Sequence, residues 1–447
     1  MIVEFNDIVL MAIKLGLVLI PFMLVPLLIL MERRGAAFIQ DRPGPNRAAI
    51  PIFGLRLRGF GLVHNLTDGI KLFFKESFVP PFAYKPFYLI APAIPVMTAV
   101  LTPSLIPWFA PISYAAANGV VTVAPSFFDA NAGILALFAL GSLSVYGVVL
   151  GSWASNSKFA LLGGLRASAM MISYEVSMGL GALGLFLVVG SFSLTSIVEW
   201  QANHVWGIVV QPIGFLLFLV SMFAECNRNP FDVAEGESEL VAGFHTEYSS
   251  VKFALFMMGE YCHIVVASAL IATLFLGGYH LPWLDTVAIK THLGGVLAGV
   301  LAVTALLFLA IAHLVHGRRK QYATLAASDR AARSKEYGFF RALFVLAGLA
   351  CLGGAVASWL LVKPQALDLW HEGAKVYPLR WSLLTAALQI GIVLAKTLFF
   401  CWLFVWVRWT LPRMRYDQIM SLGWKVLLNI ALVNLLVTAV IAKAVQS

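Results

Sequence analysis

The sequence predicts an all-α polytopic membrane protein of about ten transmembrane helices, with an additional interfacial amphipathic helix in the first cytoplasmic loop. Hydrophobic residues make up 60% of the 447 residues and charged residues only 12%, whereas soluble domains carry about 25% charged residues. Apolar runs long enough to cross a hydrocarbon core of about 30 Å recur along the whole chain. We expect these spans at residues 8–30, 87–108, 130–153, 168–190, 207–224, 252–277, 295–315, 340–362, 381–407 and 424–443.

The basic residues predict the orientation of the chain. Twenty-four of the 31 Lys and Arg residues fall in alternate loops or beside them, and loops rich in Lys and Arg face the cytoplasm. Both termini should therefore lie on the opposite side. Because the positive charge is distributed among loops rather than gathered in one patch, the net charge of +9 does not indicate nucleic-acid binding. No linker, low-complexity tract or repeat divides the sequence, so residues 1–447 are expected to form a single membrane domain.

Residues 58–78 predict the interfacial helix. Apolar residues recur there at spacings of three to four, with Lys71 and Lys75 off the apolar stripe. The segment is too short and too polar to cross a bilayer, and such helices lie in the membrane interface. Residues 320–337 are helix-permissive without a broad apolar face, and we expect them to be a solvated connector.

Three acids occur where hydrocarbon is expected: Glu175, Glu225 and Glu260. Ionisable residues inside spans are costly, face a bundle interior or a wet cavity, and commonly mark proton paths. The alternative is that each is a neutral, hydrogen-bonded packing residue. Their similar depth on three consecutive predicted helices favours a proton path, and Lys396 in the ninth span is the expected cationic partner.

Two cytoplasmic loops carry further charged residues. Residues 226–251 form an acidic loop on the side where basic residues normally dominate, and a charge run is most often a solvated face. Glycines, an Asn229-Pro230 break and interleaved phenylalanines instead suggest a shaped docking segment. In the first loop, four arginines flank a Pro43-Gly44-Pro45-Asn46 turn; topology anchoring explains the arginines but not the turn. The candidate residues of these loops are Arg33, Arg34, Arg42, Arg47, Arg228, Asp232, Glu235 and Glu237.

Other apparent motifs carry no chemistry. Gly179-x-Gly181-x-x-Gly184 matches the dinucleotide fingerprint, but it lies inside a hydrophobic span, where close helix packing explains it better. The four cysteines have no C-x-x-C spacing and the nine histidines no metal-ligand spacing. His263, beside Glu260, is expected to be a hydrogen-bonded core residue. We predict no metal.

Several strings, in order, resemble the membrane subunit of respiratory complex I that is called the H subunit in bacteria and subunit 1 in mitochondria. The resemblance covers about residues 8–278 and 381–443. The strings are Glu32-Arg33-Arg34-Gly35, Gln40-x-Arg42-x-Gly44-Pro45-Asn46-Arg47, Ser155-Asn156-Ser157-Lys158, Leu165-Arg166-Ala167, Ile172-Ser173-Tyr174-Glu175, Ala224-Glu225-x-Asn227-Arg228-x-Pro230-Phe231-Asp232, Glu235-x-Glu237-Ser238-Glu239-Leu240 and Arg408-Trp409-Thr410-Leu411-Pro412-Arg413-x-Arg415-Tyr416-Asp417.

This resemblance implies the quinone-channel and proton-coupling subunit of an NADH:quinone oxidoreductase in a bacterial cytoplasmic membrane, with both termini periplasmic. Its cytoplasmic loops would dock the hydrophilic arm, whose subunits hold the quinone site and the terminal iron–sulfur cluster, and small membrane subunits would be neighbours. Quinone would be the substrate, and this chain would bind no flavin, iron–sulfur cluster or metal. The loop arginines with Arg228, Asp232, Glu235 and Glu237 would form the quinone chamber and acidic loop. Glu175, Glu225, Glu260 and Lys396 would form the proton path.

The sequence also departs from the family pattern. Residues 285–375 resemble an insertion that adds two spans, 295–315 and 340–362, to the family's usual eight, and an even number preserves the orientation downstream. Met170 replaces the common glutamine, Cys226 the usual threonine, and Cys262-His263 lie in a stretch that usually lacks both.

Three alternatives remain open at this stage. The chain could be the homologous subunit of a membrane-bound hydrogenase-type complex, a stand-alone secondary ion transporter that uses the intramembrane acids, or a passive scaffold for peripheral enzymes. The full arginine and acidic-loop strings favour complex I over the hydrogenase. A transporter should be active alone, whereas a complex I subunit should need its partners.

Overall fold

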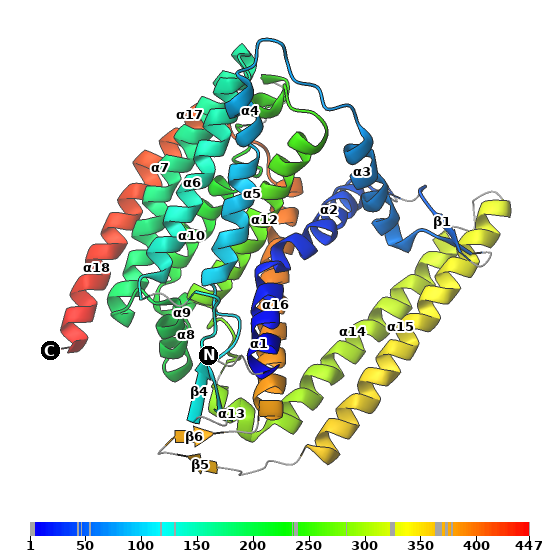
Figure 1. Cartoon of the computed structure of the whole chain (residues 1–447), viewed down its shortest axis with the longest axis vertical. Coiled ribbons are helices and arrows are strands. Elements are labelled where there is room, and N and C mark those ends of the chain that lie inside the picture. The colour runs from blue at the N-terminus through cyan, green and yellow to red at the C-terminus, as the bar shows by residue number, and fades with distance from the viewer. Residues whose placement is uncertain are drawn as a thin grey trace.

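A computed structural model describes residues 5–42, 44–45, 47–52, 55–116, 119–128, 131–234, 236, 240–282, 284–321, 327–362, 369–371, 374–376 and 379–446. Over these residues the chain is almost entirely helical (Figure 1), which confirms the all-α polytopic class. The α-helices of the first half are α1 (Phe5–Val18), α2 (Ile20–Ile39), α3 (Leu62–Phe74), α4 (Lys85–Ile90), α5 (Ala93–Leu101), α6 (Gly133–Ala154), α7 (Lys158–Val189), α8 (Leu194–Asn203), α9 (Gly207–Val210) and α10 (Pro212–Glu225).

The second half contains the most buried and the most exposed of the long helices. Its α-helices are α12 (Ser250–Phe275), α13 (Thr286–Thr291), α14 (Leu293–Gln321), α15 (Ala327–Leu361), α16 (Leu379–Thr410), α17 (Tyr416–Ser421) and α18 (Leu428–Gln446), the last two joined by a π-helical turn at Leu422–Leu427. Three short antiparallel hairpins lie in the loops: β1 (Ile50–Ile52) with β2 (Leu55–Leu57), β3 (Ile112–Ala116) with β4 (Gly119–Val123), and β5 (Leu369–His371) with β6 (Ala374–Val376).

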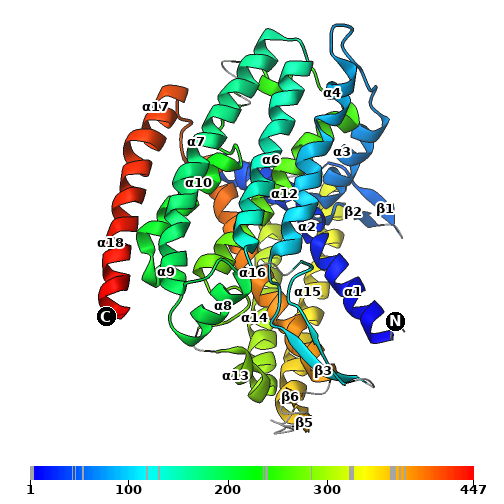
Figure 2. The same cartoon turned by 60° about the vertical axis from the view of Figure 1, so that its left-hand side comes forward.

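Nine stretches of the described chain are helical, long and apolar enough to cross a membrane. The tenth predicted span, 207–224, is shorter than expected because Gln211 leaves the helical conformation and Pro212 starts a new helix. The remaining helix, α10, has 14 residues and rises about 21 Å. The outer ends of α1 and α18 lie on the same side of the bundle in both views (Figures 1 and 2), as an even number of crossings requires.

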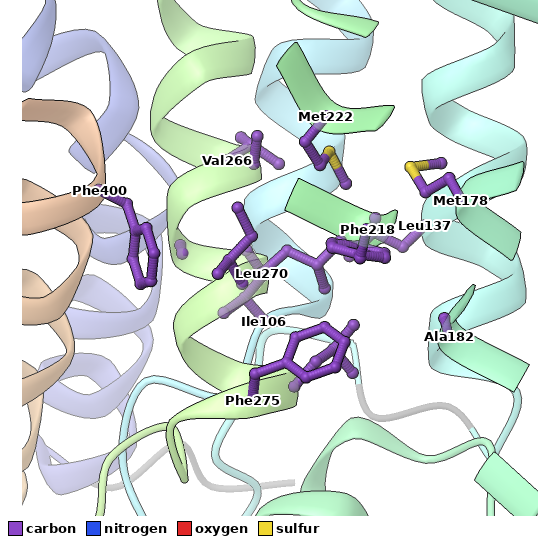
Figure 3. Close-up of a cluster of buried hydrophobic side chains, with 14 of the residues drawn as sticks. Ile106, Leu137, Met178, Ala182, Phe218, Met222, Val266, Leu270, Phe275 and Phe400 are labelled. Atoms are coloured by element: carbon purple, nitrogen blue, oxygen red, sulfur yellow. The ribbon is translucent and has the colours of Figure 1, made fainter. Parts of the chain in front are cut away.

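The centre of the bundle is α12, whose span is 61% buried, against 11% for α14. It packs among α2, α5, α10 and α16. Figure 3 shows apolar side chains from α7, α10 and α12 meeting below the acidic residues, among them Met178, Phe218 and Leu270. Gly181 of α7 lies against Leu217 of α10, where an added Cβ would come within 3.2 Å of the leucine Cβ. The glycines of this stretch therefore serve helix packing, as predicted.

Helix α3 confirms the predicted helix of the first loop. It begins at Leu62 because Phe60 and Gly61 adopt positive φ angles of 53° and 106° just before it. Its helical neighbours are α2 and α12: the Asn65 amide donates to the Pro26 carbonyl (2.6 Å), and the Ser250 hydroxyl donates to the Leu72 carbonyl (2.9 Å). The apolar side chains on its outer face are exposed: Leu62, Leu66, Ile70, Phe73 and Phe74.

Helices α14 and α15 form a long hairpin that leans away from the bundle (Figure 1). Its described ends contact the rest of the chain in two places. At one end, Ile289 and Leu293 pack against Leu388 and Ile392 of α16. At the other, the ring of Phe60 lies 4.7 Å from that of Phe340.

A buried ion pair joins this second end to the first loop. The Arg58 guanidinium lies 3.0 Å from the Glu336 carboxylate, which also accepts the Arg58 backbone N–H at 2.6 Å. Both side chains are less than 10% exposed, and Tyr337 is buried beside them. The expectation that residues 320–337 form a solvated connector is therefore wrong for Glu336 and Tyr337, because the hairpin tilts onto the 58–60 segment.

Candidate functional site: an ion-pair cluster and a row of buried acids

The charged residues of four segments converge on Glu32, near the end of α2. Its carboxylate is paired with Arg408 of α16, lies 3.8 Å from the Arg228 guanidinium, and accepts the Tyr261 hydroxyl of α12 at 2.5 Å. Arg228 also lies 3.6 Å from Glu260. The Arg228 guanidinium covers the Tyr261 ring at 4.5 Å, a cation–π geometry. Two carboxylates and two guanidiniums thus compensate one another.

Burial makes this balance necessary. The Arg228 side chain is 5% exposed, that of Glu32 10% and that of Glu260 13%. A buried ion becomes tolerable only when a counter-charge and hydrogen bonds replace the lost water, and removing one partner leaves an uncompensated charge. The cluster is therefore a place where one change of charge affects every member.

Local backbone structure places Arg228. The chain leaves α10 through Asn227, whose φ of 48° is a left-handed conformation that asparagine tolerates better than most residues. The Asn229 side chain then donates to the carbonyls of Arg408 (2.9 Å) and Leu411 (3.1 Å) at the end of α16, and the Met414 N–H donates to the Pro230 carbonyl (3.1 Å). These bonds hold the loop after α10 against the segment that supplies Arg408.

The three predicted acids adjoin two small cavities of about 30 Å³ each. The first is lined by Glu225 and Glu260, and the second by Glu175 and Glu225. Such a volume has room for about two water molecules. Glu175 also accepts a hydrogen bond from Ser142 of α6. The acids therefore form a row, Glu260–Glu225–Glu175, in which each neighbouring pair shares one cavity.

Apolar residues line the second cavity on the side away from the cytoplasmic loops. Met222, Val266 and Leu270 belong both to this lining and to the packed core in Figure 3. The row of acids thus borders a close-packed layer.

Lys396 does not join the acids. Its ammonium donates to three carbonyls just after the end of α12, those of Leu276 (2.7 Å), Gly278 (2.7 Å) and His280 (2.5 Å). The C-terminal end of a helix carries partial negative charge and unpaired carbonyls, which favour a cation. The expected partnership of Lys396 with the acids is corrected by this geometry, since the opposite end of α12 satisfies its charge.

The loop arginines separate into two kinds. Arg34 is buried and donates to the carbonyls of Phe60 (2.6 and 3.0 Å) and Pro45 (3.3 Å), while Arg33 pairs with Asp68 of α3. These two residues brace the first loop. Arg42, which donates to the Gln40 side chain (2.7 Å), and Arg47 are exposed. In the acidic loop, Asp232 is partly buried, and Glu235 and Glu237 lie outside the described residues.

Sequence reasoning named Arg228 and Glu260 but missed Glu32, Tyr261 and Arg408 as site residues. Glu32 and Arg408 each end a predicted span, where charged residues are ordinarily topology signals. Only the strings Glu32-Arg33-Arg34 and Arg408-Trp409 marked them. Their pairing depends on how α2 and α16 cross, which spacing does not reveal.

Metal chemistry finds no ligand set in the described part of the chain, where no three His, Cys, Asp or Glu side chains gather. All four cysteines are free thiols.

The comparisons with known proteins agree with this architecture. The NADH dehydrogenase family profile matches residues 12–328 and 334–439, and these ranges include the α14–α15 hairpin. The first of the H subunits of NADH-quinone oxidoreductase from Cytophaga hutchinsonii is 35% identical over 407 residues, covering 91% of this chain and 89% of that protein. The same-named protein of Solibacter usitatus is 39% identical over 415 residues (91% and 90%). The NADH-quinone oxidoreductase subunit 8 of Rhodothermus marinus is 36% identical over 417 residues (92% and 91%). The chain therefore belongs to the NADH dehydrogenase family, among the H subunits of NADH-quinone oxidoreductase.

Proposed function

We propose that this chain is the membrane subunit through which an NADH:quinone oxidoreductase couples quinone reduction to proton translocation. Quinone enters from the bilayer beside α2, α3 and α12, and is reduced next to the arginine-rich first loop by an iron–sulfur cluster of the hydrophilic arm. The chain lies in a bacterial cytoplasmic membrane with both termini periplasmic. The loops after α2 and α10 contact the subunits that hold the quinone site and that cluster, and small membrane subunits lie beside the bundle.

The observation that carries this proposal is the shared lining of the two cavities by Glu260, Glu225 and Glu175. Neighbouring carboxylates that share water can exchange a proton, which a merely structural acid has no need to do. The Glu32–Arg228–Glu260 contacts supply the connection to the loop. A change of charge at the quinone side is felt by Arg228, and Arg228 in turn changes the free energy of protonating Glu260.

The proton path is tested by replacing Glu225 with Gln in the assembled complex. The substitution keeps size and hydrogen-bonding capacity but abolishes proton exchange. We expect Glu225→Gln to assemble and yet to lose at least about 90% of coupled turnover, in line with the 10²–10⁴-fold typical of lost acid–base groups. The control is Glu199→Gln, an exposed acid on α8, which should leave turnover unchanged. Normal turnover and pumping by Glu225→Gln would leave only an anchoring role.

The bilayer-side entrance needs its own test. Exposed Phe73 on α3 is replaced by Trp, and the KM for a membrane-partitioned quinone is measured together with kcat. An entrance beside α3 predicts a raised KM with little change in kcat, because a bulkier ring hinders access rather than chemistry. Trp359→Phe, at an exposed aromatic residue of α15, serves as a remote control. An unchanged KM for Phe73→Trp would contradict this route.

A further inference from the structure

His263 lies between the acids. It follows Glu260 by three residues on α12, so the two side chains occupy neighbouring positions on the helix surface. His263 lines both cavities, the one shared by Glu225 and Glu260 and the one shared by Glu175 and Glu225. Cys226 is the other residue besides Glu225 common to both linings, and its thiol is a weak donor and acceptor.

The hydrogen bonds of His263 do not fit a structural role. The Nε2 atom is buried and has no hydrogen-bond partner among the described residues, and the same holds for Oε2 of Glu225. Leaving such an atom unsatisfied costs about 1–3 kcal/mol, whereas a cavity of this size can supply water to it. The expectation that His263 is a hydrogen-bonded core residue is therefore wrong for Nε2.

We propose that His263 is a proton-relay residue that connects the two cavities, so that a proton passes between Glu260 and Glu175 through imidazole as well as through Glu225. This inference rests on the proposed proton path and adds a member to it. Histidine suits the role because an imidazole accepts and releases a proton near neutral pH. The sequence departs from its family at this position, so the relay is a property of this chain.

The proposed transfer balances. The carboxyl group of Glu260 loses its proton to a water of the first cavity, and the neutral imidazole takes one proton from that water, which leaves a carboxylate and an imidazolium. The imidazolium then gives a proton to the carboxylate of Glu225 or, through the second cavity, to that of Glu175. The imidazole returns to its neutral form, and one negative charge has moved from the accepting acid to Glu260.

The test replaces His263 in the whole complex reconstituted into proteoliposomes. His263→Gln keeps a polar group of similar reach but cannot carry a proton, and Cys262→Ala is the matched control, since buried Cys262 lines neither cavity. We expect His263→Gln to slow pumping and coupled quinone reduction at least about tenfold, with a larger solvent deuterium isotope effect. Cys262→Ala should match the wild type.

The outcomes separate the two proposals. If Glu225→Gln is impaired while His263→Gln keeps the wild-type rate and isotope effect, the relay is wrong and the proton path stands. If Glu225→Gln is also unimpaired, the proposed function itself fails. Should His263→Gln not assemble, the wild-type complex decides: an infrared difference spectrum of quinone reduction should contain an imidazole band that shifts on ¹⁵N-histidine labelling, and a spectrum without that band would overturn the relay.

Discussion

The guanidinium of Arg228 lies 3.6 Å from the carboxylate of Glu260 and 3.8 Å from that of Glu32. One side chain of a cytoplasmic loop thus contacts both an acid at the end of α2 and the first acid of the buried row. Because all three groups are nearly excluded from water, the protonation of one depends on the charge of the others. This contact is the physical basis for connecting the loop to the proton path.

Replacing Arg228 by Met should destabilise the complex by about 3–5 kcal/mol, because two buried carboxylates lose their counter-charge. The double variant Arg228→Met with Glu260→Gln should recover a large part of that loss, since the second change removes one of the stranded charges. Thermal unfolding of the purified complex measures both. If the two losses simply add, Arg228 and Glu260 do not interact as the geometry indicates.

Tyr261→Phe removes the hydroxyl that donates to Glu32 at 2.5 Å and keeps the ring beneath Arg228. Hydrogen bonds to charged groups are worth about 1.5–3 kcal/mol, so we expect a loss of this order in unfolding free energy and a slower turnover. Tyr84→Phe, at a tyrosine that is exposed, should change neither. Equal behaviour of the two variants would show that the Glu32 contact carries no energy.

The hairpin latch, the buried pair of Arg58 and Glu336, gives a prediction independent of the acids. Arg58→Met should destabilise docking of α15 by about 3 kcal/mol, because Glu336 stays buried without a counter-charge. The double variant Arg58→Met with Glu336→Met should be close to the wild type. Arg56→Met, at an exposed arginine two residues earlier, is the matched control. Unfolding temperatures of the three variants decide, and a double variant less stable than Arg58→Met would contradict the latch.

Acidity should act on the loop that precedes α12. Burial lowers the pKa of His245 from 6.5 to about 4, so between these values the unfolded chain binds the proton and the folded chain does not. Stability therefore falls as the pH drops from 6.5 towards 4, by on the order of 2–3 kcal/mol. His245→Gln should flatten this part of the stability curve by about one proton. An unchanged slope, measured by denaturation across this pH range, would show that His245 is not the responsible group.

The sequence predicted the elements well and their meeting points poorly. Apolar run length located α6, α7 and α12, and the residue spacing of 58–78 indicated α3, since these features depend on local composition. The break at Gln211 and Pro212 shortened one span. Lys396 was assigned to the acids because a lysine inside a span needs a partner, yet hydrogen-bond acceptors at the end of α12 satisfy it equally well. Glu32, Arg408 and the Arg58–Glu336 pair depend on helix crossings, which single-sequence patterns do not contain.

The central claim is that Glu225 changes its protonation when quinone is reduced. Infrared difference spectroscopy of the assembled complex, oxidised against reduced, tests it most directly. The account predicts a carboxylic-acid band that shifts in D₂O and that disappears in Glu225→Gln, while Glu199→Gln retains it. A spectrum of Glu225→Gln identical to that of the wild type would contradict the account.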